Sequence, residues 1–177
     1  MKRALLFFLI ISSSAFSQSN YIFTATDVDG VVHNTQDYFD QGKPVMIMSF
    51  VDYWGVYWSI HEEGGIVDLY NTLGQGGTGE VVILYIAGFG FDTEAEIYDV
   101  DYSSDLGTGY ENVDLTAGHD IPVIVATNNP EVNANPKGEW VWLCPEDGFA
   151  YLFGTILTSE DMLANLYSQF SMEKSRS

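Results

Sequence analysis

Four aromatic side chains gather in one short turn of the chain. They are, in order, Tyr53, Trp54, Tyr57 and Trp58. The turn follows an apolar run, residues 45–51, and precedes a segment with the apolar spacing of a helix. Such a turn lies at the carboxyl end of a strand, where α/β folds place their sites. Exposed tyrosine and tryptophan rings make good anchors for a protein, peptide or glycan. We therefore expect a binding site here; the alternative is that the rings fill interior volume.

The sequence contains one cysteine, Cys144, so an internal disulfide is impossible. Cys144 falls inside a predicted strand, next to Pro145. A cysteine buried in a strand behaves as a small apolar residue and is usually inert. Cys144 is nevertheless the only candidate for thiol chemistry, and a divergent thiol–disulfide oxidoreductase that uses it stays open as an alternative.

An acidic segment offers a second kind of chemistry. Asp99, Asp101 and Asp105 place carboxylates at intervals that resemble a calcium-binding loop. The segment lacks the glycine at the sixth position and the glutamate at the twelfth that such loops carry. A solvated acidic loop and a calcium-stabilised structural module are the two hypotheses for it.

The remaining polar residues give no catalytic pattern. His33, His61 and His119 fall in a strand end, a helix and a loop, and nothing in their spacing connects them. Residues 74–79 match G-x-G-x-x-G, but they follow a helix and precede a strand, which is the reverse of a dinucleotide-binding loop. We predict no cofactor.

The elements that position the aromatic turn follow from apolar periodicity. Residues 45–51 and 81–87 are continuous apolar runs, typical of central strands that are covered on both faces. A helix from the turn to about Leu73 joins them into a βαβ unit, with a kink expected at Gly64-Gly65 because glycine disfavours a helix interior. Before this unit, residues 21–33 predict a hairpin that turns at Asp27–Gly30, and Asn34 or Thr35 begins a short helix.

After the βαβ unit the pattern is less regular. Thr93 caps a predicted short helix through about Tyr98, and residues 121–125 form a short strand or extended segment. Residues 139–144 and 149–153 predict a second hairpin, since they alternate and are separated by a turn. A capping signature at residues 158–161 begins a last amphipathic helix that ends near Phe170.

The strand–turn–helix unit resembles that of thioredoxin-like proteins, in which two cysteines of a C-x-x-C motif lie between the strand and the helix. In this comparison Trp54 and Tyr57 stand at the two cysteine positions, with Tyr53 before them and Trp58 after them at aromatic positions. The order of hairpin, short helix, residues 42–44 (Gly-Lys-Pro) and apolar strand also resembles the redoxin branch of the family.

The resemblance implies a three-layer α/β/α fold with a mixed central sheet and an N-terminal β-hairpin. It also implies a protein whose redox chemistry is missing, because the two cysteine positions hold no thiol. Family members place a cis-proline before the hairpin strand that faces the motif. That position falls near Gly138 or Glu139, for which we expect a trans peptide; Pro122 and Pro136 are both off register, and the isomer at each stays open. In such a turn we expect Trp54 to be exposed and Tyr57 half-buried.

The N-terminus predicts export. Two basic residues, an apolar segment and a run of small residues make residues 1–18 a secretory signal peptide. The apolar segment is too short for a permanent membrane span, so we expect a periplasmic or extracellular protein with no stable span after cleavage. The domain then comprises residues 19–170, and residues 171–177 form a polar tail.

Charge limits the possible partners. All 25 acidic residues lie after residue 18, with four basic residues, so this part of the chain carries a net charge of −21. Binding to nucleic acid rests on lysine and arginine, so we expect no nucleic-acid partner. The acidity indicates solubility or, as the functional alternative, cation binding or a basic partner. The sequence predicts an exported, redox-inactive thioredoxin-like module that binds an unknown protein, peptide or glycan.

Overall fold

The computed structural model describes residues 16–17, 21–62, 65–88, 90–133, 140–144 and 149–153. The predicted signal peptide, apart from Phe16–Ser17, lies outside these residues, as do Pro136, the last predicted helix and the polar tail. The predictions for those segments therefore stay predictions.

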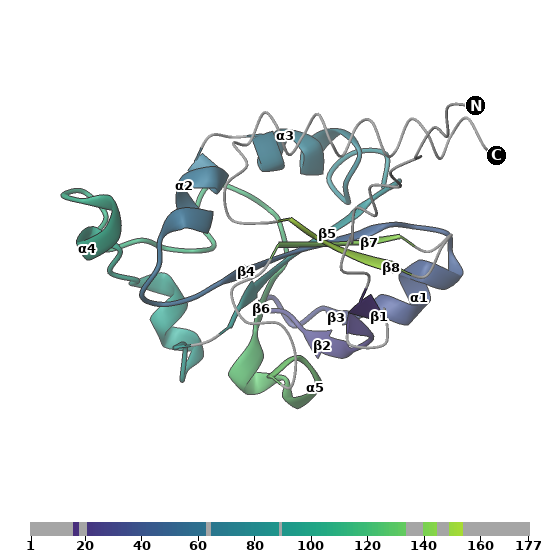
Figure 1. Ribbon diagram of the computed structural model, residues 1–177, viewed down its shortest axis with the longest axis horizontal. Helices are drawn as coiled ribbons and strands as arrows, with labels where there is room; N and C mark the ends of the chain where they lie inside the picture. The colour runs from purple at the N-terminus through teal and green to yellow at the C-terminus, as the bar shows by residue number, and fades with distance from the viewer. Residues whose placement is uncertain are drawn as a thin grey trace, which may run out of the picture.

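A mixed sheet forms the middle of the molecule (Figure 1). Its strands are, in spatial order, β1 (Phe16–Ser17), β8 (Phe149–Phe153), β7 (Trp140–Cys144), β4 (Val45–Phe50), β5 (Val82–Ala87) and β6 (Val123–Val125). The strands β4, β5 and β6 run parallel, whereas β7 runs antiparallel to β4 and β8 antiparallel to β7. The predicted mixed sheet is confirmed, and β6 extends its parallel half by one strand.

The central strands β4 and β5 are buried along their whole length. This explains why both are apolar without alternation: helices and the hairpin cover the two faces of the sheet, so side chains on either side of each strand meet protein. Their register pairs Val45 with Val82 and Phe50 with Ala87, so both strands end at the same edge of the sheet.

Two helices cover one face of the sheet. They are α2 (Val56–Glu62) and α3 (Gly65–Thr72), and both lie on the same side in Figure 1. Ile66, Leu69 and Tyr70 of α3 point into the core with Met46, Met48 and Ile83 of the sheet. The helix predicted from the turn to about Leu73 is described as α2 and α3. Residues 63–64, between them, lie outside the described residues, so the kink expected at Gly64-Gly65 stays a prediction.

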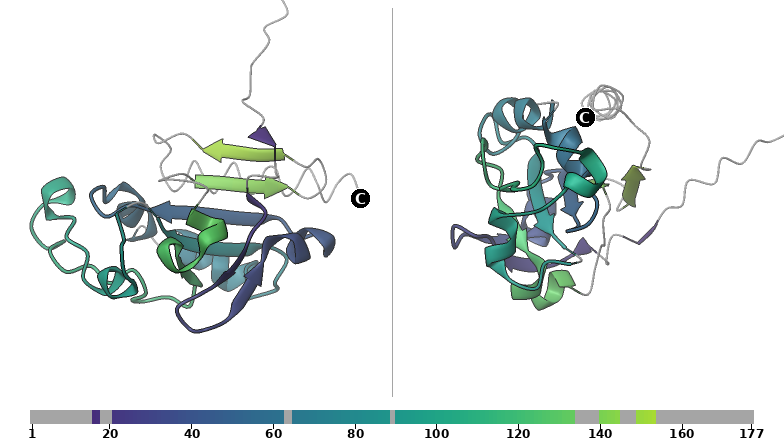
Figure 2. Two further views of the ribbon diagram at one scale, coloured as in Figure 1. Left: turned by 90° about the horizontal axis from the view of Figure 1, so that it is seen from below. Right: turned by 90° about the vertical axis from the view of Figure 1, so that its left-hand side faces the viewer.

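The other face is covered by the N-terminal hairpin and two short helices (Figure 2). The hairpin comprises β2 (Thr24–Thr26) and β3 (Val32–Asn34), and the helices are α1 (Thr35–Asp40) and α5 (Pro130–Asn133). Gly30 has φ 82°, a value that favours glycine, and it closes the predicted turn. The side chain of Asn34 accepts hydrogen bonds from the backbone N–H groups of Gln36 and Asp37, so it caps α1 as predicted.

A long excursion joins β5 to β6. It contains the 3₁₀ helix η2 (Glu94–Tyr98), with a capping box at Thr93, and the short helix α4 (Ser103–Leu106). A second 3₁₀ helix, η3 (Ala126–Asn128), follows β6. The segment is anchored by Ile97, Val100, Tyr102, Val113 and Leu115, which are buried in the core under α2.

The predicted three-layer α/β/α arrangement is confirmed. No peptide bond in the described ranges is cis, so the bond before Pro122 is trans. Within the same ranges, no helix has the length and apolar character needed to cross a membrane.

Candidate functional site

The aromatic turn, residues 53–58, follows the carboxyl end of β4 and includes the first residues of α2, Val56–Trp58. Val51 and Trp54 form an isolated antiparallel bridge, which makes the turn tight. Gly55 directly precedes α2, and its carbonyl accepts the first helical hydrogen bond of α2, from the N–H of Ser59 over 3.0 Å. The turn is therefore held by backbone contacts at both ends.

The four rings of the turn differ in exposure. Tyr53 is 63% exposed, Tyr57 is 3% exposed and Trp58 is buried, whereas Trp54 is partly buried against the core. The expectation of an exposed Trp54 and a half-buried Tyr57 is thus wrong. Trp54 packs edge-on against Tyr57, with their ring centroids 5.8 Å apart, and this contact turns it inward. The ring that the turn presents to solvent is Tyr53.

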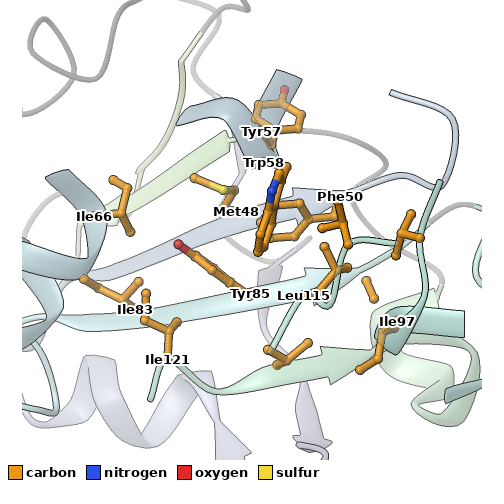
Figure 3. Close-up of a cluster of buried hydrophobic side chains, with 14 of the residues drawn as sticks. Met48, Phe50, Tyr57, Trp58, Ile66, Ile83, Tyr85, Ile97, Leu115 and Ile121 are labelled. Atoms are coloured by element: carbon orange, nitrogen blue, oxygen red, sulfur yellow. The ribbon is translucent and has the colours of Figure 1, made fainter. Parts of the chain in front are cut away.

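Trp58 anchors the turn to the sheet. Figure 3 shows Trp58 reaching from α2 to Phe50 and Tyr85 on the sheet. Its ring centroid lies 6.5 Å from that of Phe50, which in turn makes an edge-on contact with Tyr85 at 4.9 Å. Burial of these large rings fixes the start of α2, so at Trp58 the interior-filling hypothesis is the better description.

The excursion between β5 and β6 folds back onto the turn. The carboxylate of Asp105 accepts a hydrogen bond from the backbone N–H of Gly55 at 3.0 Å, and the hydroxyl of Tyr102 donates to the carbonyl of Val51 at 2.9 Å. Leu106 lies so close to Gly55 that a Cβ placed there would be 2.6 Å from its Cδ1. The turn is therefore covered by α4, which packs against α2.

Asp105 occupies the position at which an anion is stabilised by a helix N-terminus. Gly55 is the residue just before α2, and a carboxylate on its N–H reproduces, through a tertiary contact, the bond that the acidic residue of a capping box makes. The partial positive charge of the helix start favours this carboxylate. A helix N-terminus also stabilises the thiolate of a redox motif; at the start of α2 the carboxylate of Asp105 takes that place.

Two of the candidate calcium ligands, Asp101 and Asp105, have separate partners. Hydrogen bonds from Ser103, first from its side chain and then from its backbone N–H at 2.9 Å, lower the pKa of Asp101. Asp105 points to Gly55 instead. Among the residues that the structure describes, no group of three or more His, Cys, Asp or Glu side chains is arranged to hold a metal ion. These contacts make the segment a covering loop.

Cys144 lies at the opposite end of the sheet from the aromatic turn. It follows Leu143, which pairs with Val45 at the first residue of β4, whereas the turn follows the last residue, Phe50. At about 3.3 Å per residue, the length of β4 separates Cys144 from the turn by about 20 Å. The structure does not bring these two predicted site features together.

Two imidazoles, that of the buried His61 in α2 and that of the partly buried His119, lie side by side. The Nδ1 atom of His61 is 2.9 Å from the hydroxyl of Tyr85, and the His61 ring stacks on Trp58 with centroids 4.6 Å apart. The ring of His119 makes an edge-on contact with His61 at 4.8 Å. The expectation that nothing connects the histidines is therefore wrong for this pair. Contacts between residues so distant in the sequence leave no local pattern that would have indicated them.

Both imidazoles of this pair are held neutral. Burial, followed by the neighbouring His119, lowers the pKa of His61 to about 4. Burial also lowers the pKa of His119, whose Nε2–H donates to the carbonyl of Leu115 at 3.0 Å and whose Nδ1 accepts from the N–H of Ile121 at 3.1 Å. Burial raises the pKa of Tyr85, so its hydroxyl keeps its proton. The cluster is packed, and it stabilises α2 on the sheet.

The third histidine belongs to the N-terminal hairpin. The Nε2 atom of His33 lies 2.8 Å from Oδ2 of Asp27, and its Nδ1 atom lies 2.8 Å from the hydroxyl of Tyr38. The other carboxylate oxygen of Asp27 accepts from the N–H groups of Asp29 and Val31. The carboxylate of Asp27 thus bonds both the turn and His33, and the pairing of β2 with β3 confirms the predicted hairpin.

Solved structures show which fold this is. MTB DsbF, in its mixed oxidized and reduced forms, superposes with a TM-score of 0.53 at 11% identity, over 85% of this chain and 96% of that one. A secreted Mycobacterium tuberculosis disulfide oxidoreductase homologous to E. coli DsbE gives a TM-score of 0.52 at 11% identity, over 85% and 98% of the two chains.

The fold is thioredoxin-like. This confirms the fold that the resemblance implied. Because the identity with these structures is low, the likeness is limited to the fold. No protein-family model matches the sequence. No curated protein matches it either. Residues 54–57, which stand at the place of the C-x-x-C motif, include Gly55, whose N–H is bonded by Asp105.

Proposed function

We propose that the chain is an exported, redox-inactive thioredoxin-like module that binds a protein, peptide or glycan through its aromatic turn. The contact between Asp105 and Gly55 carries the proposal. A thiol–disulfide oxidoreductase needs a thiolate at the start of this helix and a second thiol to resolve the mixed disulfide. Here the helix start is capped by a carboxylate, and Trp54 and Tyr57 supply no thiol.

The position of the single cysteine supports the absence of redox chemistry. Cys144 ends β7 at the edge of the sheet opposite to the turn, about 20 Å away by the length of β4. A thiol there does not benefit from the start of α2. This placement disfavours the alternative of an oxidoreductase that uses Cys144.

A binding role is supported by the surface at the turn. Tyr53 is 63% exposed beside the partly buried Trp54, whereas Tyr57 and Trp58 hold the turn from inside. A large aromatic ring on a rigid support loses little conformational entropy when it contacts a ligand, which is why tyrosine is common in binding surfaces. Export is supported by the N-terminal sequence pattern, and one similar structure is of a secreted protein.

The redox half of the proposal is tested by insulin reduction with dithiothreitol and by trapping of mixed disulfides. The chain without residues 1–18 is compared with its Cys144→Ser variant and with a C-x-x-C oxidoreductase as a positive control. We expect no turnover, and a Cys144 thiol that reacts only after unfolding. Turnover that disappears in Cys144→Ser would refute the redox-inactive assignment.

The binding half is tested by site-specific cross-linking in the cell envelope. A photoreactive side chain replaces Tyr53 in one protein and Asp68, an exposed residue of α3, in the control. We expect a discrete adduct from position 53 alone, and its loss when Trp54→Ala is added. Identical adducts from both positions, or none from position 53, would refute binding through the turn.

A further inference from the structure

A polar hollow lies away from the aromatic turn, between the β2–β3 turn, the end of η2 and the segment that precedes β6. Its volume is about 340 Å³. Asp29, Tyr98, Thr116, His119 and Asp120 contribute its polar and aromatic lining. Val28, Ile121 and Val123 complete it. We call these residues the acidic hollow.

The charges around the acidic hollow are negative and uncompensated. Asp29 and Asp120 line it, and neither carboxylate forms an ion pair or a hydrogen bond within the described ranges. Lys43 is the only lysine or arginine in those ranges. Burial raises the pKa of Tyr98, and the carboxylates of Glu94, Asp114 and Asp29 raise it further, as expected in a negative potential.

The aromatic groups of the hollow suit a cation as well. Tyr98 is 43% exposed, so one side of its ring is accessible to a ligand. His119 adds no positive charge, because its Nε2–H is donated to Leu115 and its Nδ1 accepts from Ile121. An ammonium or guanidinium group gains from the face of an aromatic ring in addition to its attraction to carboxylates.

The hairpin that contributes Val28 and Asp29 to the hollow also carries exposed apolar side chains. Val31 and Val32, at the end of the same hairpin turn that carries Asp29, are 53% and 62% exposed. An apolar group of a ligand that covers these two valines removes apolar surface from water, which favours binding. A ligand that combines apolar groups with positive charge therefore matches this region.

We propose that the acidic hollow and the hairpin tip bind a basic segment of a partner protein. A lysine or arginine side chain enters the hollow between Tyr98 and the carboxylates of Asp29 and Asp120. An apolar residue beside it in the partner covers Val31 and Val32. Electrostatic complementarity of this kind increases the association rate and selects basic partners over neutral ones.

The alternative explanation is diffuse attraction. A chain with 25 acidic and six basic residues attracts any cationic peptide, wherever the carboxylates lie. The two explanations differ in what happens when particular carboxylates are neutralised. Diffuse attraction depends on net charge only, whereas a site depends on Asp29 and Asp120.

The test measures fluorescence polarisation of a labelled peptide of alternating lysine and valine, with a lysine-to-glutamate peptide as control. The protein is the chain without residues 1–18, in low and in physiological salt. The variant Asp29→Asn/Asp120→Asn is compared with Asp37→Asn/Asp68→Asn, which removes the same charge from exposed positions on α1 and α3. Thermal unfolding of each variant verifies that it is folded.

We expect the hollow variant to bind the basic peptide about tenfold more weakly than the control variant, as two exposed ion pairs predict. Tyr98→Ala should weaken binding by a further severalfold through loss of the ring face. Equal affinities for the two double variants would leave only diffuse attraction and overturn the proposal. Absence of binding to the basic peptide in low salt would overturn it too. Neither result bears on the aromatic turn, which is probed through Tyr53.

Discussion

The backbone N–H of Gly55 donates a hydrogen bond to Oδ2 of Asp105 over 3.0 Å, although fifty residues of chain separate them. The bond joins the turn before α2 to a helix of the excursion between β5 and β6. It gives the helix start a negative cap that no neighbouring residue in the sequence supplies. Several predictions about stability depend on this contact and on the side chains around it.

Replacement of Asp105 by alanine should destabilise the chain by about 1 kcal/mol, the usual cost of losing a helix cap. Amide hydrogen exchange is the sharper measurement, because the N–H of Gly55 loses its acceptor and should exchange faster. Asp99→Ala is the matched control, since Asp99 is exposed in the same segment. Faster exchange at Gly55 in both variants, or in neither, would contradict a specific cap.

A methyl group at position 55 should be costly mainly because of Leu106, although it would also lie 3.0 Å from the Cβ of Tyr102. The Cβ of Gly55→Ala would lie 2.6 Å from Cδ1 of Leu106, so the side chain or α4 must move, at a cost of about 1 to 3 kcal/mol. Urea unfolding of Gly55→Ala, Leu106→Ala and the double variant measures the coupling. We expect the double variant to be more stable than the sum of the two single changes predicts; strict additivity would argue against the contact.

Tyr102→Phe tests the second link between the excursion and the turn. The Tyr102 side chain is fully buried, and its hydroxyl donates to the carbonyl of Val51 at 2.9 Å. Removal of the hydroxyl leaves that carbonyl without this donor, so we expect a loss of about 1 to 2 kcal/mol in the free energy of unfolding. Tyr110→Phe, which removes an exposed hydrogen bond from the Tyr110 hydroxyl to Glu62, is the control and should change stability much less.

Acid should destabilise the chain partly through His61. Its pKa is about 4 in the folded chain and 6.5 for an unperturbed imidazole, so the unfolded chain binds the proton first. Stability that is present above pH 6.5 is therefore lost as the pH falls toward about 4. His61→Gln keeps a polar group beside Tyr85 but does not titrate. Melting temperatures across this range should fall more steeply for the parent chain, and parallel curves would rule His61 out.

The turn should support thiol chemistry once thiols are supplied. We expect Trp54→Cys/Tyr57→Cys to close a disulfide that dithiothreitol reduces, because this spacing places two residues at a strand–turn–helix junction. The shifted pair Gly55→Cys/Trp58→Cys is the control, and it should be less stable because Trp58 anchors α2. Thiol titration with and without reductant shows whether each cysteine pair has formed a disulfide. A disulfide in the shifted pair alone would move the correspondence with C-x-x-C proteins by one residue.

The sequence predicted those parts of the fold whose signals are local. Apolar runs indicated β4 and β5, and Asn34 indicated the start of α1. These features depend on backbone propensity and burial, and both leave a periodic or positional pattern.

The site was less predictable because tertiary contacts build it. The sequence pattern indicated Asp105 as a candidate calcium ligand, and only the fold shows that it caps α2. The inward position of Trp54 depends on Tyr57 and on the covering helix α4, and the pairing of His61 with His119 depends on the path of the excursion. Contacts of this kind depend on three-dimensional packing and leave no periodic pattern in the sequence.

The return of the excursion to the turn has a consequence for the order of folding. The bonds from Tyr102 to Val51 and from Asp105 to Gly55 each close a loop of about fifty residues, which costs entropy before any contact forms. The parallel pairing of β4 with β5 must already be in place for these partners to meet. The excursion should therefore assemble late and open early, so that the chain uncovers Trp54 through partial unfolding while its sheet stays intact.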